Sequence, residues 1–333
     1  MSNIDITIMV CTYNRSSSLR LCLKKLIGQD TESQFTFENL VVDNASTDDT
    51  HSVVMQIAKS SCNVPVKYVM EKKPGLANAR NTAIKEAKGD WIVCFDDDEF
   101  AEPEWLRELY KIATTRRADC VGGRTLLDLH LVPNVSISKG CRGLLGESDY
   151  GEFARRLRGK EYPHDGNVIR HRRVFDAVGE FDTAMVNGGQ DQDYTRRAMA
   201  KNFRMWYAPK AVAYHSVPPY RLKPIYFKWS SYRAGYNFAY MDHKYGGPKR
   251  LLVLCIMRIG QALLMNIPKY LINLLKSNKS ESLWRKALLY RCLAYCRMCI
   301  YLLFPRLFGK GSILHGLEFR KEREKFVHEE LSL

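Results

Sequence analysis

Short apolar runs alternate with amphipathic segments over the first 125 residues. The apolar runs predict buried strands, while leucine spacing such as Leu19, Leu23 and Leu26 predicts helices between them. The expected strands are 5–14, 39–44, 64–71, 90–99 and 118–125, and the expected helices are 15–29, 46–60, 75–89 and 102–115. This alternation indicates an α/β fold with a mostly parallel, Rossmann-like sheet and helices on both faces.

Polar residues follow several of these strands at the point where each strand ends. They are Thr12, Tyr13 and Asn14 after the first strand, Asp43 and Asn44 after the second, and Asp96 to Glu99 after the fourth. Ligands of open parallel sheets bind beyond the carboxyl ends of the strands. We therefore expect these residues to converge on one edge of the sheet.

Four consecutive acids, Asp96–Glu99, directly follow the apolar run WIVCF. Adjacent carboxylates repel one another, and a divalent cation with its preference for oxygen ligands removes the repulsion. Side chains two apart on a strand face the same way, so Asp96 and Asp98 are expected to address one ion while Asp97 points elsewhere. The alternative is a solvated acidic loop. A metal at this place could neutralise a diphosphate.

The segment 126–245 is less regular and carries further candidates. A Gly-Gly turn precedes a predicted helix that starts near Gln190 and contains Asp191 and Asp193. About 100° per helical residue points these two acids apart, so one of them should face a substrate; alternatively, both complement a helix N-terminus. The run AVAYH ends in His215, which is either a site residue or a hydrogen-bonded strand end.

Beyond residue 246 the pattern changes to helices rich in Leu, Ile, Tyr, Lys and Arg, with Pro268 expected to kink or split one of them. Charges interrupt the apolar runs, so we expect no good transmembrane span and favour basic amphipathic helices at a membrane interface. The alternative is a helical layer packed on the preceding domain. Cys292, Cys296 and Cys299 share one helix face, as an apolar stripe or, less simply, metal ligands.

Charge is distributed unevenly along the chain. The net charge is +15 overall, but residues 201–333 hold 24 Lys and Arg against 7 Asp and Glu. Such an excess favours an anionic partner, such as an anionic membrane surface, over a merely solvated surface. The ten cysteines have no repeated zinc-site spacing, and the chain opens with a strand. These features predict a reducing, cytoplasmic compartment, with the protein on the inner face of the plasma membrane.

Several motifs, in order and spacing over about residues 5–220, resemble the family 2 glycosyltransferases of the GT-A fold, of the bacterial cell-surface polysaccharide type. The motifs are VCTYNR, VVDNASTDDT, GLANARNTAIKEAKGDWIVCFDDDE and GGQDQDYTRRA. The resemblance implies a donor site of Thr12, Tyr13, Asn14, Asp43, Arg80, Asp96 and Asp97. Asp43 would hydrogen-bond the base, typically uracil. Asp98 would ligate the metal, with His215 as a second contact.

The resemblance also implies the chemistry. Asp191 takes the position of the catalytic base, Gln190 replaces the usual Glu, and Asn167 lies where an acceptor pocket is expected, although a turn role is open for it. The implied reaction is an inverting transfer of a hexosyl group from a UDP-sugar to a glycan or lipid-linked hydroxyl, with Mn²⁺ or Mg²⁺.

The expected organisation is a catalytic domain over 1–245, with a nucleotide-binding half at 1–125 and an acceptor-binding half at 126–245, followed by a basic helical region at 246–333. Two other classes remain open. A sugar nucleotidyltransferase would need a Gly-rich basic first turn, which VCTYNRSSS lacks, and a degenerate membrane- or partner-binding scaffold would have no use for the acid run. Nucleic acid is not expected, because the basic residues alternate with an apolar stripe.

Overall fold

The computed structural model describes residues 4–132, 135–159, 161–185 and 188–307. It divides into two compact units, each described by itself. The sheet unit comprises Met1–Asp128, Glu147–Val186 and Gln190–Ser216. The helical unit comprises Leu129–Gly146, Asn187–Gly189 and Val217–Leu333.

The sheet unit is built on one sheet of nine described strands. The strands are β1 (Ile6–Thr12), β2 (Phe37–Asp43), β3 (Val66–Met70), β4 (Trp91–Asp96), β5 (Glu99–Ala101), β6 (Cys120–Asp128), β7 (Arg155–Arg156), β8 (Asn167–His171) and β9 (Met205–Ser216). Their order is β3-β2-β1-β4-β8-β6-β9-β5, and β7 pairs with β9. The first four strands in this order run parallel, whereas β8 is antiparallel to both β4 and β6.

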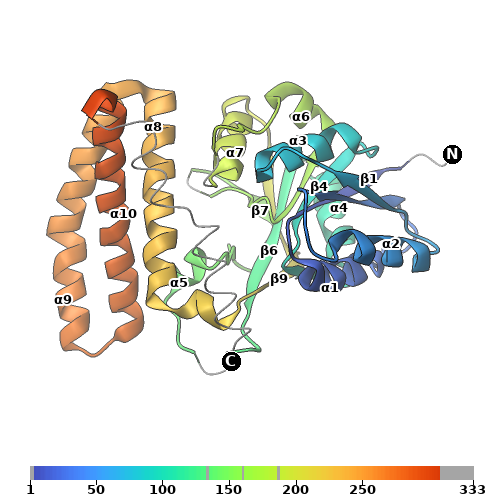
Figure 1. Ribbon diagram of the computed structural model, residues 1–333, viewed down its shortest axis with the longest axis horizontal. Helices are drawn as coiled ribbons and strands as arrows, with labels where there is room; N and C mark the ends of the chain where they lie inside the picture. Colours follow the sequence, from blue (N-terminus) through green and yellow to red (C-terminus); the bar gives the residue numbers. More distant parts are fainter. Residues whose placement is uncertain (1–3, 133–134, 160, 186–187, 308–333) are drawn as a thin grey trace. The chain divides into compact units, whose positions relative to one another are not determined.

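Helices cover both faces of this sheet (Figure 1). One apolar core joins β1 residues Ile6, Ile8 and Val10 to α1 (Ser16–Ile27), α2 (Thr50–Ser60) and α4 (Trp105–Thr115). The other core lies under α3 (Leu76–Glu86), α6 (Arg172–Val178) and α7 (Gln190–Ala200). Because both faces are covered, the central strands are apolar on both sides, which explains their continuous apolar runs.

The alternation of strands and helices predicted the parallel half of the sheet, and the expected strands at 118–125 and AVAYH are present as β6 and β9. The alternation did not predict that β8 lies between β4 and β6. Val168 packs into one core and Ile169 into the other, so this short strand is fit for a central position.

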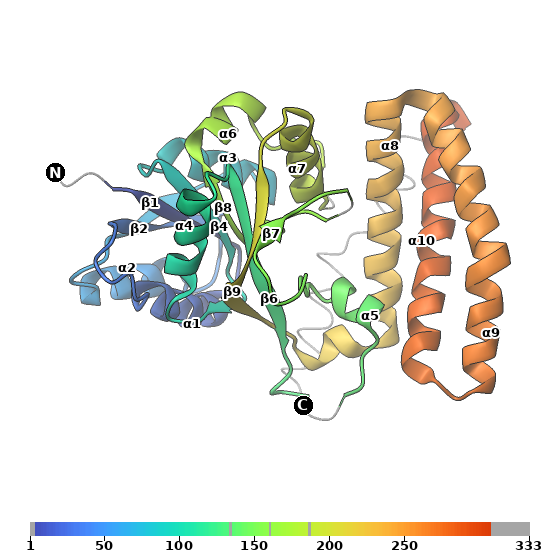
Figure 2. The ribbon, with the colours of Figure 1, turned by 180° about the vertical axis from the view of Figure 1, so that it is seen from behind.

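The helical unit contains α5 (Lys139–Leu144), α8 (Pro224–Gln261), α9 (Ile267–Leu275) and α10 (Lys279–Leu303), with short 3₁₀ turns at Pro219–Leu222 and Pro305–Leu307. The three longer helices lie side by side in both ribbon views (Figures 1 and 2). Helix α8 is broken at Gly247, where φ is 68°, next to Pro248. The boundary expected at 245/246 lies just before this break, whereas the sheet unit ends earlier in the chain, at Ser216.

Pro268 does not split its helix as expected, because Asn266 and Ile267, the two residues before it, keep helical backbone angles. A π-helical turn, Ala262–Asn266, separates α8 from α9, and Pro268 lies in the first turn of α9. The helix continues through this turn, since the Ile267 N–H donates to the carbonyl of Ala262, five residues earlier.

The prediction of no transmembrane-type segment is wrong by length and composition. Pro224–Leu275 is long and apolar enough to cross a membrane, with 17% of its most apolar 18-residue window buried. Within this segment, residues 251–268 contain one charged residue, Arg258. Lys249 and Arg250 lie directly before them and Lys269 directly after them. The Arg258 guanidinium lies 4.3 Å from the centre of the Tyr295 ring, on the neighbouring helix.

The cysteine stripe on α10 packs against α8. The sulfur of Cys296 lies 3.6 Å from that of Cys255, and Cys299 is buried in the core of the helical unit. Among the residues that the structure describes, no three or more Cys, His, Asp or Glu side chains are grouped to hold a metal ion. The stripe is therefore packing surface, as the simpler interpretation predicted.

A glycine pair in α8 tests the packing of this unit. A Cβ at Gly235 would lie 2.4 Å from the carbonyl oxygen of Arg291, whereas a Cβ at Gly260 would meet nothing within 4 Å. We expect Gly235→Ala to destabilise the unit by about 1–3 kcal/mol through overpacking, and Gly260→Ala to stabilise it by about 0.5–1 kcal/mol through helix propensity. Urea denaturation followed by circular dichroism measures both; equal effects would contradict the close α8–α10 crossing.

Candidate active site

The acid run lies at the carboxyl end of β4. Asp96 is the last residue of β4, a two-residue turn follows, and Glu99 begins β5. In the register of the parallel strands, Thr12 is opposite Asp43 and Cys11 is opposite Asp96. The expected convergence of Thr12, Asp43 and the acid run on one edge is therefore present.

Arg15 binds two acids of the run. Its guanidinium pairs with Asp97, and its Nη1 lies 3.1 Å from an Asp98 carboxylate oxygen. The Thr12 hydroxyl also donates to Asp97, over 2.7 Å. Asp96 and Asp98 were expected to face the same way, with Asp97 pointing elsewhere. Instead, the strand ends at Asp96, and the turn that follows brings Asp97 and Asp98 to the same cation, Arg15.

Asp98 also lies beside His215. Residue Glu99 of β5 pairs with His215 of β9, which places the His215 Nε2 3.6 Å from an Asp98 oxygen. One carboxylate and one imidazole suit a divalent ion such as Mn²⁺ if substrate oxygens complete its coordination. The residues thus fit a metal that arrives with a diphosphate, while the described side chains do not form a complete metal site of three or more ligands.

Asp96 faces a different cation, Arg80 of α3. The Arg80 guanidinium lies 3.7 Å from an Asp96 oxygen and 3.0 Å from an oxygen of Asp165. Asp165 is buried and also pairs with the fully buried Arg170. Two guanidinium groups therefore share one interior carboxylate, and one of them reaches the acid run.

The acids of the site have pKa values shifted in different directions, because burial and neighbouring acids raise them and the arginines lower them. Burial of the surrounding site, together with Asp98 and Asp97, raises the pKa of Asp96 to about 6 against the effect of Arg80. Burial also raises the pKa of Glu99, whereas Arg170 and Arg80 outweigh burial and lower the pKa of Asp165.

Gly166 permits this crowding. A Cβ at this position would lie 2.5 Å from a Glu99 carboxylate oxygen and 2.9 Å from an Asp96 oxygen. A side chain at this position of the loop before β8 would therefore displace the carboxylates of Glu99 and Asp96 from their present places.

The expected base-binding residue Asp43 is engaged within the protein. It is buried, and its carboxylate accepts hydrogen bonds from the Tyr68 hydroxyl at 2.8 Å and the Ser46 N–H at 2.9 Å. Asn14 adopts a left-handed φ of 50° and accepts from the Thr47 N–H. Tyr13 is half-buried between Thr12 and Asn14 in this turn. The turns after β1 and β2 are thus linked into one rim.

The two acids of α7 have different environments. Asp193 is fully buried and pairs with Arg197 over 2.9 Å, one turn along the helix. Asp191 is only partly buried, and its charge acts on both Arg80 and His164. Asp193 is therefore a structural residue, and Asp191 is the acid of this helix that lies near the arginine of the acid run.

Two residues expected near an acceptor serve internal contacts. The buried Gln190 donates to the Met185 carbonyl over 2.7 Å. Asn167 is 1% exposed; its carbonyl accepts from the Trp105 indole over 2.8 Å, and its amide donates to the Arg124 carbonyl. The structure thus places Asn167 in the interior of the sheet unit, away from any surface that a substrate could reach.

Four residues lie near the site that were not expected there from the sequence: Arg15, His164, Asp165 and Arg170. Arg15 stood in the quoted motif VCTYNR, and a cation close to an acid run was a usable signal. No comparable signal marked Asp165 and Arg170, because a buried ion pair five residues apart on a loop and strand has no sequence periodicity.

Comparison with known proteins agrees with this geometry. Residues 7–135 match the model of glycosyl transferase family 2. The chain is similar to glycosyltransferase AglE of Haloferax volcanii, with 25% identity over 221 residues, 65% of this chain and 68% of that protein. It is also similar to chondroitin synthase of Pasteurella multocida, with 26% identity over 247 residues, but it spans only 25% of that longer protein.

Solved structures give the fold. Mannosyltransferase PcManGT of Pyrobaculum calidifontis, in complex with GDP-Man and Mn²⁺, has a TM-score of 0.60 at 18% identity, over 89% of this chain and 88% of that one. S. aureus TarS 1-349, in complex with UDP-GlcNAc, has a TM-score of 0.54 at 17% identity, over 90% and 91%. The resemblance seen in the sequence is thus confirmed: residues 7–135 match glycosyl transferase family 2, and the fold is GT-A.

Proposed function

We propose that this protein transfers a hexosyl group with inversion from a nucleoside diphosphate sugar, in the first instance a UDP-sugar, to a hydroxyl of a glycan or lipid-linked acceptor in cell-surface polysaccharide synthesis. The observation that carries the proposal is the position of Arg80, which lies 3.7 Å from Asp96 of the acid run and on which the charge of Asp191 of α7 acts. The acids expected to bind the donor and the candidate base therefore lie near the same arginine.

Each charged group has a role in this proposal. Asp98 and His215 would hold Mn²⁺ or Mg²⁺, which supplies Lewis-acid stabilisation of the departing diphosphate. Thr12, Tyr13, Asn14 and Asp43 form the nucleotide rim, with Asp96, Asp97 and Arg80 beside the sugar and diphosphate. Arg15 holds Asp97 and Asp98 in place. Asp191 would take the proton of the acceptor hydroxyl as its oxygen attacks the anomeric carbon.

A membrane-surface location at the inner face of the plasma membrane fits the helical unit. Helix α9 has no buried residue, although it is rich in Leu and Ile. Leu264 is 80% exposed and Leu275 is 87% exposed, within a region of excess positive charge. Exposed apolar residues among basic ones suit an anionic lipid surface, and this supports a lipid-linked acceptor.

The donor and the metal are tested with a panel of nucleotide sugars, each with Mn²⁺ or with EDTA. We expect one donor to be hydrolysed slowly in the presence of metal only, and Asp98→Asn to reduce this turnover by more than about tenfold because an anionic metal ligand is lost. Asp90→Asn, on an exposed acid that precedes β4, is the control and should retain activity. Turnover that persists in EDTA would contradict the metal-dependent mechanism.

The base is tested by two substitutions on α7. Asp191→Asn should lower kcat by about 10²–10⁴-fold and leave the affinity for the nucleotide unchanged, because only proton transfer is lost. Asp193→Asn should instead lower the stability by about 1–3 kcal/mol, since Arg197 loses its buried partner. Single-turnover rates, nucleotide titrations and thermal melts separate the two. If Asp191→Asn kept full activity, another group would have to be the base.

Membrane contact is tested by sedimentation with vesicles that contain phosphatidylglycerol. Replacement of both Leu264 and Leu275 by Ser should reduce the bound fraction about tenfold or more, because two exposed apolar side chains no longer leave water. The matched control replaces Leu21 and Met70, which are exposed on the sheet unit, by Ser and should bind like the wild type. Equal binding of both variants would exclude this face as the membrane contact.

A further inference from the structure

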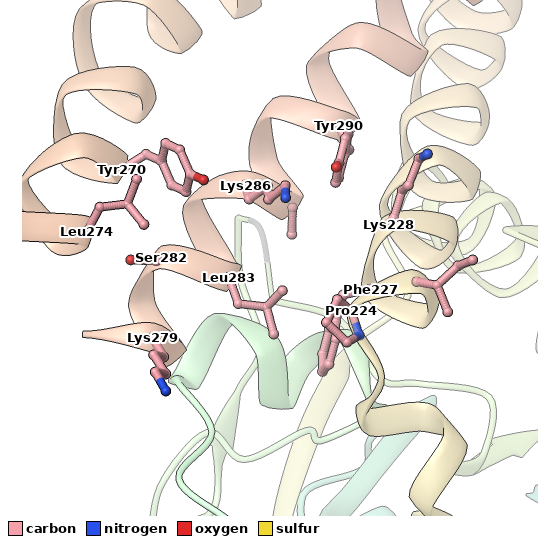
Figure 3. Close-up of a pocket in the computed structure, with 12 residues that line it drawn as sticks. Pro224, Phe227, Lys228, Tyr270, Leu274, Lys279, Ser282, Leu283, Lys286 and Tyr290 are labelled. Carbon is pink, nitrogen blue, oxygen red and sulfur yellow. The ribbon is translucent and has the colours of Figure 1, made fainter. Parts of the chain in front are cut away.

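A pocket of about 470 Å³ lies within the helical unit, where α8, α9 and α10 meet. Figure 3 shows Tyr270 and Leu274 reaching into it from α9, Leu283 from α10 and Phe227 from α8. Its volume is in the range of small-molecule sites. Everything that lines it belongs to one compact unit, so its shape is independent of the placement of the sheet unit.

The lining combines two chemistries. Most of the side chains are apolar or aromatic, but Lys228 of α8 and Lys279 and Lys286 of α10 also line the pocket. The ammonium groups of Lys228 and Lys286 lie 5.6 Å and 5.9 Å from the centre of the same ring, that of Tyr290. Two cations from different helices are thus held near one aromatic side chain.

The described part of the chain offers these cations no anionic partner. Among the residues described by the structure, no carboxylate is within salt-bridge distance of Lys228, Lys279 or Lys286. The nearest acid in the sequence, Glu281, pairs instead with Arg285 over 2.6 Å. The positive charge on this side of the pocket is therefore available to a ligand.

The α10 side of the pocket is one continuous helix face. Lys279, Ser282, Leu283, Lys286 and Tyr290 recur at the spacings of three and four residues that align side chains on a helix. The hydroxyl of Ser282 is buried and has no hydrogen-bond partner in the described part of the chain. A buried hydroxyl without a partner is costly, so its presence beside the pocket is a second feature that a polar ligand group would satisfy.

We propose that this pocket binds one anionic amphiphile, a lipid whose apolar chain lies among the three helices and whose phosphate is held by Lys228 and Lys286. An apolar lining alone would accept any hydrophobic molecule, and lysines alone would accept any anion. Their combination in one pocket selects a molecule that has both parts. This binding goes beyond the proposed transfer reaction and requires neither a nucleotide sugar nor a metal.

Decyl phosphate below its critical micelle concentration is the probe, and calorimetric titration of the full chain is the measurement. We expect saturable binding of one molecule per chain, at least about tenfold tighter than that of decyl maltoside, because the neutral head cannot use the lysines. Inorganic phosphate should not bind at the same concentrations, because it lacks the chain. Competition by farnesyl phosphate and by lysophosphatidic acid then tells an isoprenoid phosphate from a membrane phospholipid as the occupant.

Three variants locate the binding. The double change Lys228→Ala and Lys286→Ala should weaken decyl phosphate binding about tenfold or more and leave decyl maltoside unaffected. The matched control, Lys249→Ala with Lys269→Ala, removes the same charge from exposed positions of this unit outside the pocket and should bind like the wild type. Leu274→Trp, at a half-exposed position, should fill the pocket and weaken both amphiphiles.

Several results would overturn the proposal. They are equal affinity for the phosphate and the maltoside, no binding of decyl phosphate, or unchanged binding by the Lys228/Lys286 variant. Thermal melts of every variant ensure that a loss of binding is not a loss of fold. Because the sheet unit takes no part in this titration, an inactive transferase site would leave the result unaltered.

Discussion

The balance of buried and half-buried charge at the carboxyl end of β4 is the interaction on which the site depends. Four acids in sequence would repel one another and disorder the turn without compensation. The compensation comes from Arg15 after β1 and Arg80 on α3. Arg80 also pairs with Asp165, which in turn pairs with Arg170. The charge pairs therefore tie the first strand, the third helix and β8 to one point of the sheet.

The helical unit presents the opposite situation. In the sheet unit the acids meet arginines, whereas the pocket among α8, α9 and α10 has lysines that meet no acid among the described residues. Apolar side chains of α9 are likewise left exposed. A folded unit that leaves both cations and large apolar side chains without partners is suited to an environment that supplies both complements, and a membrane of anionic lipids does so.

Periodicity and strand-end chemistry predicted the parts of the fold that are local. The strands β1 to β4 and the meeting of Thr12, Asp43 and Asp96 follow from short-range pattern. Short-range pattern did not predict the insertion of β8, the burial of Asn167 or the contact of both Asp97 and Asp98 with Arg15. Each depends on a long-range pairing or on the residue at which a strand ends, and neither leaves a signal in spacing. The motif resemblance predicted the candidate site, but the interior ion pairs at that site required the structure.

The pairing of Arg15 also bears on why a metal would be needed at all. Arg15 already stabilises Asp97 and Asp98, so the fold has no need of an ion to hold the acid run together. Yet Arg15 and Arg80 supply two positive charges against four acids, and Arg80 is shared with Asp165. The edge therefore stays negative, and an anionic diphosphate would be repelled from it. A divalent cation that enters with the diphosphate reverses that repulsion, so the acid run would favour a nucleotide with its metal over the nucleotide alone.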